Sequence, residues 1–409
     1  MGNKKRKKKR NSTADRLISK IAKVIRYLFS KSEYYDYNLL AGVILLICFG
    51  LVMLYSTSSY DAQLTFKGND MWYFTRQAGY SLLAVLFAIV ISKMNYHWFA
   101  PWAEGLYLVS MVLMAMVRFT SLGVEAYGSR RWLKIGIQFQ PSEIAKIAVI
   151  VYLPIIILKM GKRIKDRKAV AVLLMFAAIP ALGAWKLTDN LSTGVIIGGI
   201  ACFLIFVAHP KTKIFLMIAG GVSAVVITAV TIMGMTMTTS ENFRIRRILA
   251  WLHPEENLAD GGYQVQQALY AIGSGGFFGK GLGNSAQKLG TIPEAQNDMI
   301  FAIVCEELGV FGAVLLLLLF GYVLYRLFFI AQNAPDLYGS LMVSGVFAHF
   351  ALQVVLNLCV VLNVIPTTGI SLPFISYGGS SAFFLMAEIG LALCVARTIK
   401  FKKSNSGNR

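Results

Sequence analysis

The chain contains 409 residues, of which 56% are hydrophobic and only 15% are charged, and its formal net charge is +20. Soluble domains carry about a quarter charged residues, so this composition excludes an ordinary soluble enzyme or binding domain. The positive charge stands in tails and short loops, not on one folded face, which argues against nucleic-acid binding and indicates membrane topology. Five cysteines stand in apolar runs without a CxxC pair, so neither a disulfide framework nor a zinc site is predicted.

The N-terminal region is basic in two different ways. Residues 1–16 form a charge run that predicts a disordered tail attracted to anionic lipid. Residues 17–31 place apolar side chains at helical spacing between lysines and an arginine, which predicts an amphipathic helix on a membrane surface. A soluble helix that binds a partner is the alternative. No cleavable signal peptide is expected, because the basic stretch is too long for an n-region.

Apolar runs long enough to cross a hydrocarbon core, which needs about 20 helical residues, recur along the chain. They predict about ten transmembrane helices, near residues 39–57, 77–92, 98–117, 143–160, 168–186, 191–208, 213–237, 299–327, 338–364 and 380–397. The predicted fold class is an all-α integral membrane protein. Its membrane domain covers 39–397, preceded by a cytoplasmic basic tail and surface helix at 1–38 and followed by a cytoplasmic tail at 398–409.

An even number of crossings places both termini on one side of the membrane. That side would carry 27 of the lysines and arginines, against 12 on the other side. The positive-inside rule therefore predicts cytoplasmic termini. The loops 119–142 and 238–298 then lie outside, the second between helices 7 and 8, and long structured loops on one face of a bundle often carry function.

The first polar constellation is YGSRRWLKIGIQFQPSEIAK, residues 127–146. Trp132 suits a membrane interface, and Pro141 suits the first position of a helix. Glu143 and Lys146 follow at i, i+3, so they share one face of the first helical turns. An ionisable pair at that depth is expensive and predicts a functional site, with a self-compensating structural ion pair as the alternative.

The second constellation is the Gly-rich stretch within residues 261–309. Glycine lets backbone N–H groups approach a ligand closely, which suits phosphate oxygens, although a turning loop also needs glycines. The GxxxxGK[ST] spacing of a nucleotide-binding loop is absent. Five residues of this loop are predicted to contact substrate: Gln264, Gln267, Gly275, Gly276 and Lys288.

Asp298 stands at the end of that loop, where helix 8 is predicted to begin. An aspartate at a helix start commonly caps backbone donors. The same position puts a carboxylate at the outer mouth of the bundle beside cationic loops, where it could act as a general base on a hydroxyl. Composition leaves the two interpretations open.

Two further polar features are weaker. Residues 367–383, TTGISLPFISYGGSSAF, interrupt an apolar run with proline and glycines, which is tolerated only inside protein or beside a cavity. Structural support of helix 10 is favoured there over substrate contact. His349 stands alone on an apolar helix, which is more typical of hydrogen-bonded packing than of a ligand.

At these motifs the chain resembles the SEDS family (shape, elongation, division and sporulation). The similarity covers about residues 36–400, and its motifs are SRRW (129–132), QPSEIAK (140–146), AIGSGG (271–276), PEAQNDMIFAIVCEELG (293–309) and LPFISYGGSS (372–381). The stretch GLGNSAQKLG, residues 281–290, is more similar to the FtsW and SpoVE branches of that family than to RodA.

The resemblance implies a peptidoglycan glycosyltransferase that polymerises lipid II, an undecaprenyl-pyrophosphate-linked disaccharide-peptide, outside the bacterial cytoplasmic membrane. It also implies a class B penicillin-binding protein and other division or elongation membrane proteins as partners. The family's catalytic aspartate matches Asp298, and family positions of functional importance match Arg131, Trp132, Glu143 and Lys146. One departure is DNLST at 189–193 in place of a PDLGT-like motif, so no role is carried onto Asn190.

The implied reaction needs a base for the attacking hydroxyl and cations for the pyrophosphate charge that develops. Asp298 would supply the first and Arg131 with Lys146 the second. A divalent cation (Mg²⁺ or Mn²⁺) could share that task, although no ligand cluster specifies one. The alternatives are a flippase for the same lipid, which would need polar groups across the bilayer midplane, and a non-catalytic scaffold.

Overall fold

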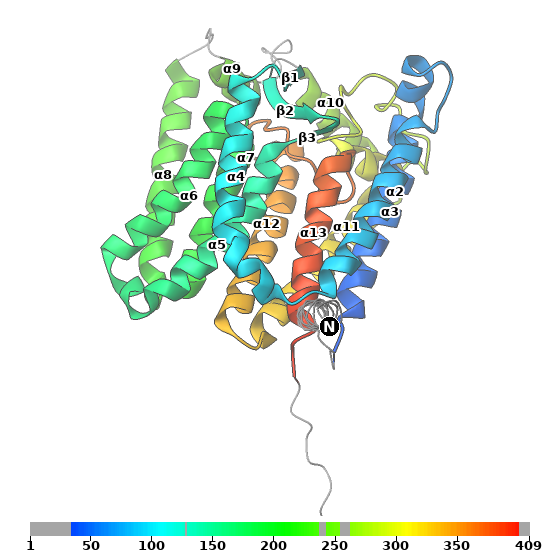
Figure 1. The fold of residues 1–409 in the computed structure, drawn as a ribbon. Coiled ribbons are helices and arrows are strands. Elements are labelled where there is room, and N and C mark those ends of the chain that lie inside the picture. The colour runs from blue at the N-terminus through cyan, green and yellow to red at the C-terminus, as the bar shows by residue number, and fades with distance from the viewer. Residues whose placement is uncertain (1–33, 127–128, 237–242, 254–261, 401–409) are drawn as a thin grey trace, which may run out of the picture.

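The computed structural model describes residues 34–126, 129–236, 243–253 and 262–400, which form a helical bundle with a small sheet at one end (Figure 1). The tail 1–16 and the amphipathic helix predicted over 17–31 lie outside these residues. The first and last described residues lie at the end of the bundle opposite the sheet (Figure 1). An even number of crossings produces this arrangement.

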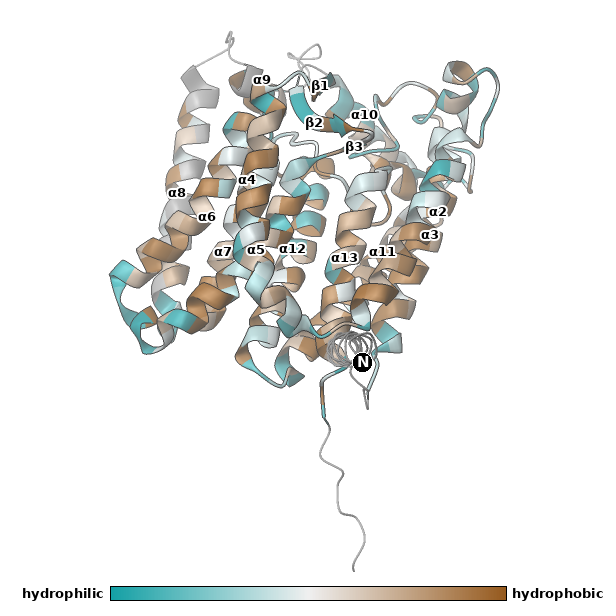
Figure 2. Cartoon of the chain, viewed as in Figure 1, coloured by the Kyte–Doolittle hydropathy of each residue, from teal (hydrophilic) through white to brown (hydrophobic). Residues whose placement is uncertain are grey.

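Nine helices in the described part of the chain are long and apolar enough to cross a membrane. They are α2 (Tyr37–Thr65), α3 (Trp72–Ser92), η1 (Tyr96–Trp102) continued by α4 (Ala103–Phe119), α5 (Pro141–Met160) continued by η2 (Gly161–Lys165), α6 (Arg167–Leu187), α7 (Leu191–Ala208), α11 (Ile300–Asn333), α12 (Leu337–Val361) and α13 (Gly379–Ala396). Apolar residues cover much of their length and hydrophilic residues gather toward the two ends (Figure 2). The predicted membrane bundle is confirmed.

The tenth predicted run corresponds to α8 (Thr212–Thr236), a helix that packs against α7. Its 25 residues extend for about 37 Å, which is enough to cross a bilayer core of about 30 Å.

Short polar side chains mark the starts of three spanning helices. Asp36, Asn190 and Asp336 precede α2, α7 and α12, and each accepts a hydrogen bond from the backbone N–H three residues further on, at 2.9, 3.0 and 2.8 Å. Such caps satisfy donors that the first helical turn leaves unpaired. The helices therefore begin where the sequence supplies a side-chain acceptor.

The structure adds a small sheet that the sequence analysis did not anticipate. Strands β1 (Gly123–Ala126), β2 (Ser129–Ile135) and β3 (Ile137–Phe139) pair antiparallel in the order β1-β2-β3, with Val124 opposite Trp132 and Leu133 opposite Phe139. Gly136, at φ +73°, makes the tight turn between β2 and β3. The sheet packs against α4 and α5 and leads directly into Pro141.

The long loop before α11 is partly helical. It contains α9 (Phe243–Leu252) and α10 (Gly262–Ser274), followed by irregular chain up to Met299. The glycine pattern had suggested a ligand-facing loop, but Gly273 lies in the helix α10. Both helices lie at the same end of the bundle as the sheet (Figure 1).

The longest helix, α11, is broken at Gly309, whose backbone (φ 66°, ψ −164°) is accessible essentially to glycine alone. Two N–H groups after the break cannot reach their helical partners. Those of Val310 and Phe311 donate instead to the carbonyls of Gly276 and Phe277, each at 3.0 Å. Carbonyl groups of the loop that follows α10 thus replace the helical acceptors of these two N–H groups.

The same loop also supplies the missing donors. The carbonyls of Glu306 and Glu307, freed by the break, accept hydrogen bonds from the N–H groups of Lys280 and Gly281, each at 2.9 Å. The loop lies so close to α11 that residue 279 has no space for a side chain, since a Cβ on Gly279 would lie 2.2 Å from the Glu307 carbonyl oxygen. All four backbone groups are paired, which a protein in lipid requires.

We predict that Gly309→Ala destabilises the protein by at least about 1–3 kcal/mol, the usual cost of a strained backbone conformation. The added methyl group would also lie 2.4 Å from backbone atoms of Phe277 and Gly279. Thermal unfolding of the purified protein in detergent measures the effect. Gly321→Ala is the matched control on the same helix, because a Cβ there meets nothing within 4 Å. An unchanged unfolding midpoint for both variants would contradict the proposed importance of the break at Gly309 and its pairing with the loop.

Candidate active site

The carboxylate predicted to be catalytic, Asp298, lies two residues before the start of α11. It is half-buried. The N-cap position of α11 is Met299, and no side chain caps this helix start. The alternative role of Asp298 as a helix cap is therefore not what the structure shows, and the carboxylate is left available.

Two arginines from separate elements face Asp298. Arg131 lies on β2, where alternate residues point to the same side, and its neighbour on that side, Leu133, is fully buried against the bundle. Arg247 comes from α9 and donates to the carbonyl of Thr367 at 3.3 Å. Both guanidinium groups interact electrostatically with the Asp298 carboxylate.

Arg247 is the residue that sequence reasoning missed. The signal in the sequence was the run of three arginines at 244, 246 and 247 in an amphipathic segment, but nothing there indicates which of them turns toward Asp298. Lys146, which the implied mechanism used as the second cation, forms no hydrogen bond or ion pair with Asp298 among the described residues.

Burial dominates the electrostatics of the site. Loss of contact with water raises the pKa of Asp298 to about 6; its own backbone N–H, Arg247 and Arg131 only partly oppose this rise, while Glu294 adds to it. Burial also lowers the pKa of Arg131, and the nearby Arg247 lowers it further. An arginine nevertheless stays charged at neutral pH, so one titratable carboxylate sits beside two permanent cations.

Ser129 lies on the same side of β2 as Arg131, which donates to its hydroxyl at 3.3 Å, whereas Arg130 and Trp132 lie on the opposite side. Arg130 donates to the carbonyls of Thr120 and Arg118, at 2.5 and 3.4 Å, which ties the sheet to the end of α4. Trp132 shares that side by strand alternation and is half-buried. Arg131 and Trp132 are therefore separated by the strand, and only Arg131 faces the carboxylate.

Glu143 and Lys146 form an ion pair in the first turns of α5, with 2.8 Å between carboxylate and ammonium and side chains only 7% and 2% exposed. Glu143 Oε2 has no partner, and neither do Ser142 Oγ and Gln140 Nε2 beside it, although all three atoms are buried. A buried polar atom without a partner costs about 1–3 kcal/mol. This concentration of unpaired atoms favours a ligand-facing pair over a purely structural one.

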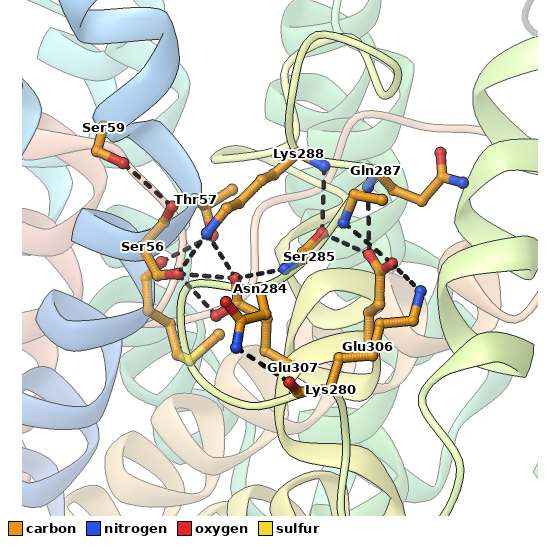
Figure 3. A network of polar contacts seen from close by, with 12 residues as sticks. Ser56, Thr57, Ser59, Lys280, Asn284, Ser285, Gln287, Lys288, Glu306 and Glu307 are labelled. Atoms are coloured by element: carbon orange, nitrogen blue, oxygen red, sulfur yellow. Dashed lines mark hydrogen bonds and ion pairs between the residues drawn. The ribbon is translucent and has the colours of Figure 1, made fainter.

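Lys288 is held by the protein itself. Its ammonium group lies 2.8 Å from Glu307 and 3.0 Å from the Ser56 hydroxyl, and the lysine and glutamate side chains are 6% and 0% exposed (Figure 3). Ser56 of α2 also donates to both Glu307 oxygens. The ammonium group of Lys288 is therefore already paired with Glu307 and Ser56. Its predicted contact with substrate remains a prediction.

A second pair lies next to the first. Lys280 is 2.6 Å from Glu306, which also accepts hydrogen bonds from the Ser285 hydroxyl and from the N–H of Ala286 (Figure 3). Glu306 and Glu307, adjacent on α11, thus fasten the loop 280–288 at two points.

The remaining predicted contacts have structural surroundings of their own. Gly275 is buried, and a Cβ there would lie 2.0 Å from the Cys305 carbonyl oxygen, so its close approach is to α11. Gly276 offers its carbonyl to the helix break. Gln264 of α10 donates to the Pro293 carbonyl at 3.1 Å, and Gln267, one turn on, is half-buried. Their contact with substrate remains a prediction.

No group of three or more His, Cys, Asp or Glu residues in the described ranges is placed to hold a metal ion. Within these ranges, no cluster of such side chains selects a metal ion. The divalent cation considered from the chemistry is not specified by this site.

The sequence of this chain is similar to those of known proteins. A family model of cell cycle proteins, covering FtsW, RodA and SpoVE, matches residues 37–400. The chain belongs to the FtsW/RodA/SpoVE family. Stage V sporulation protein E of Bacillus subtilis (strain 168) is 36% identical over 372 residues, which are 90% of this chain and 98% of that protein. A probable peptidoglycan glycosyltransferase FtsW of the same organism is 33% identical over 378 residues, 90% of this chain and 92% of that protein.

A solved structure supports the same family assignment. It is described as "Structural coordination of polymerization and crosslinking by a peptidoglycan synthase complex", and its matching chain has a TM-score of 0.73 and 28% identity. The match covers 89% of this chain and 98% of that chain. This member of the FtsW/RodA/SpoVE family is therefore a multi-pass integral membrane protein whose fold resembles that chain over almost its whole length.

The departure from the family's PDLGT-like motif has a simple structural consequence. Asn190 accepts the backbone N–H of Thr193 at 3.0 Å and so caps α7. Asn caps a helix about as well as Asp, so this substitution preserves the helix start. Asp189, which has a positive φ of 44°, lies 3.8 Å from Arg118.

We predict that Lys288→Met destabilises the protein by about 3–5 kcal/mol, because the buried Glu307 carboxylate loses its cation. The double variant Lys288→Met/Glu307→Gln should recover most of that stability, since the uncompensated charge is gone. Thermal unfolding measures both. Lys280→Met is the comparison variant, with a smaller expected loss because Lys280 is 36% exposed.

Glycan strand formation by the stable double variant separates the two roles of Lys288. If the lysine only fastens the loop, we expect activity within about tenfold of wild type. A stable but inactive double variant would instead establish the predicted contact with substrate.

Proposed function

We propose that this protein is a peptidoglycan glycosyltransferase that polymerises lipid II into glycan strands during cell division or shape maintenance. The observation that carries the proposal is the half-buried Asp298, whose pKa lies near 6 and which two arginines flank at the outer mouth of a membrane bundle. Relatives at 36% and 33% identity support it, one of them named a probable peptidoglycan glycosyltransferase.

In the proposed reaction, the acceptor sugar's 4-hydroxyl oxygen bonds to the anomeric carbon of the donor. The bond from that carbon to the lipid pyrophosphate breaks, and configuration inverts. Asp298 takes the hydroxyl proton as general base. The pyrophosphate leaves with its bonding electrons, so no carboxylic acid is needed to protonate it, in contrast to glycoside hydrolysis.

Arg131 and Arg247 are suited to the charge that develops on the leaving pyrophosphate. Planar guanidinium groups bind phosphate oxygens through paired hydrogen bonds, and Arg131 Nε is buried and unpaired. In a partly desolvated site such fixed cations stabilise a transition state more strongly than in water.

Glu143 and Lys146 serve the same site in this proposal. Their unpaired neighbours at the outer end of α5 support a polar wall for the sugar or pyrophosphate groups of substrate. Trp132, Gln264, Gln267, Gly275, Gly276 and Lys288 are proposed as further substrate contacts on the basis of the family motifs and the loop sequence.

We propose that any Mg²⁺ or Mn²⁺ enters with the substrate pyrophosphate and is not a resident ion of the protein. The scarcity of clustered ligands among the described residues supports this, as does the habit of Mg²⁺ of binding phosphates with few protein ligands.

The proposed location is the bacterial cytoplasmic membrane, with both termini cytoplasmic and the Asp298 site outside. The positive-inside bias and the shared end of the described termini support this orientation. The proposed partner is a class B penicillin-binding protein, and the structural relative from a peptidoglycan synthase complex supports an assembly of that kind.

The flippase alternative needs a polar pathway through the middle of the bundle. In the part of the chain that the structure describes, His349 and Glu388 form an ionisable pair at mid-helix, 2.7 Å apart and both fully buried. The two side chains contact each other, so the pair does not by itself provide a path for a pyrophosphate headgroup. Polymerisation by purified protein in detergent, where no leaflet is crossed, would separate the two functions.

We predict that Asp298→Asn lowers polymerisation of lipid II by about 10²–10⁴-fold, the usual worth of a positioned base. Asn keeps the size of the side chain but cannot accept the proton. The measurement is glycan strand formation by the purified variant with its penicillin-binding protein. Activity within about threefold of wild type, set against that expected loss, would end the proposal.

The pH profile of the wild-type enzyme is a second consequence of the same assignment. The base must be ionised, so kcat/KM should fall as pH decreases through about 6, the pKa of Asp298. An ordinary aspartate would hold the rate down to about pH 4. A rate independent of pH between those values would contradict the base role.

The orientation is tested by cysteine labelling in intact cells. A thiol at Asn69, exposed in the α2–α3 connection, should react with an impermeant reagent, whereas one at Lys165, exposed at the end of η2, should not. A variant without introduced thiols controls for the native cysteines, and the reverse pattern would overturn the topology.

A further inference from the structure

Asn357 of α12 connects the candidate base to a second segment. Its amide nitrogen donates to the backbone carbonyl of Asp298 at 2.8 Å and to that of Ile370 at 2.7 Å, and the side chain is fully buried. Both acceptors are carbonyls, so the amide must turn its nitrogen toward them.

The amide oxygen of Asn357 is left without a partner among the described residues. A buried acceptor without a hydrogen bond costs about 1–3 kcal/mol. An apolar side chain could fill this position without that cost. The presence of asparagine therefore indicates that its two donated hydrogen bonds are its function.

The segment that contains Ile370 carries part of the site. In residues 362–378, the carbonyl of Thr367 accepts from Arg247, and Gly369, at φ +68°, lies close to Asp298, because a Cβ there would be 3.9 Å from the carboxylate. Asn357 therefore bonds on one side to the residue that bears the base and on the other to the segment that fixes Arg247.

We propose that Asn357 is a positioning residue, which holds the Asp298 carboxylate in register with Arg247 and keeps it out of water. This inference rests on the proposed function of Asp298 as general base. A displacement of about 1 Å in such a group can cost on the order of 10²-fold in rate, so two hydrogen bonds from one rigid, buried side chain are enough to matter.

The same helix supplies a matched control. Gln353 lies one turn away on the same face of α12, is also buried, and donates to the Ser371 carbonyl at 3.0 Å. It thus ties α12 to the same segment without contacting Asp298. If Asn357 only anchors residues 362–378, removing Gln353 should have a similar effect.

The experiment compares Asn357→Leu and Asn357→Ser with Gln353→Leu in the full-length protein, reconstituted with its penicillin-binding protein and supplied with lipid II. For the Asn357 variants we expect kcat to fall at least about tenfold while KM stays within about twofold. Gln353→Leu should keep kcat near the wild-type value.

The pH profile gives a readout that a merely structural role would not move. The groups that face Asp298 are Arg131 from β2, Arg247 from α9 and Glu294 from its own loop. Loss of the two hydrogen bonds that Asn357 donates should admit water to the Asp298 carboxylate. The acid limb of kcat/KM should therefore move from about pH 6 toward the ordinary aspartate value of about 4. A smaller folded fraction lowers the rate at every pH without moving the limb.

Three results would overturn the inference: an unshifted limb, a kcat within about twofold of wild type, or the same changes in Gln353→Leu. Asp298→Asn measured alongside keeps the two ideas apart. If that variant is active, the proposed function fails; if it is inactive while the Asn357 variants behave as wild type, only the positioning role fails.

Discussion

The end of the bundle that carries the sheet and Asp298 depends on the break of α11 at Gly309. A helix in lipid can be interrupted only where other protein groups pair with the freed backbone, and here the loop after α10 supplies two donors and two acceptors. The adjacent Glu306 and Glu307 then fix the same loop through Lys280, Lys288 and Ser56. Backbone pairing and side-chain charge pairing act on one joint between loop and helix.

This joint has a consequence for Asp298. The residue lies between the fastened loop 280–288 and the start of α11, and its carbonyl is held by Asn357 from α12. The base is thus placed by elements on both sides of it in the sequence. A carboxylate fixed in this way can remain partly desolvated, with a raised pKa, while facing two arginines from other parts of the chain.

The mouth of the bundle is built from irregular backbone that side chains satisfy. Carbonyls of residues 362–378 accept hydrogen bonds from Ser192 of α7, Arg247 and Trp251 of α9, and Gln353 and Asn357 of α12. These contacts tie the segment to α7, α9 and α12, and the structural support predicted for helix 10, which is α13, stays a prediction. The same contacts bring polar groups to a place where a lipid-linked pyrophosphate could meet them.

Much of this architecture follows from the sequence alone. The spanning helices follow because bilayer thickness sets the length of an apolar run, and Glu143 with Lys146 follows because i, i+3 spacing places the pair on one helical face. Asp298 could be singled out from its motif and its place before an apolar run. Each of these properties depends on residues close together in the sequence, so it can be predicted from one sequence.

Only the tertiary structure decided which distant groups meet. The strands at 123–139 pair across turns whose register the helical pattern does not reveal, and the role of Lys288 depends on Glu307 and on Ser56, 232 positions away. Arg247 joins the site because α9 packs beside residues 362–378, and Asn357 does so because α12 brings its amide within hydrogen-bond distance of the Asp298 carbonyl. Such contacts depend on how the helices pack, and packing sums many weak interactions that no single motif encodes.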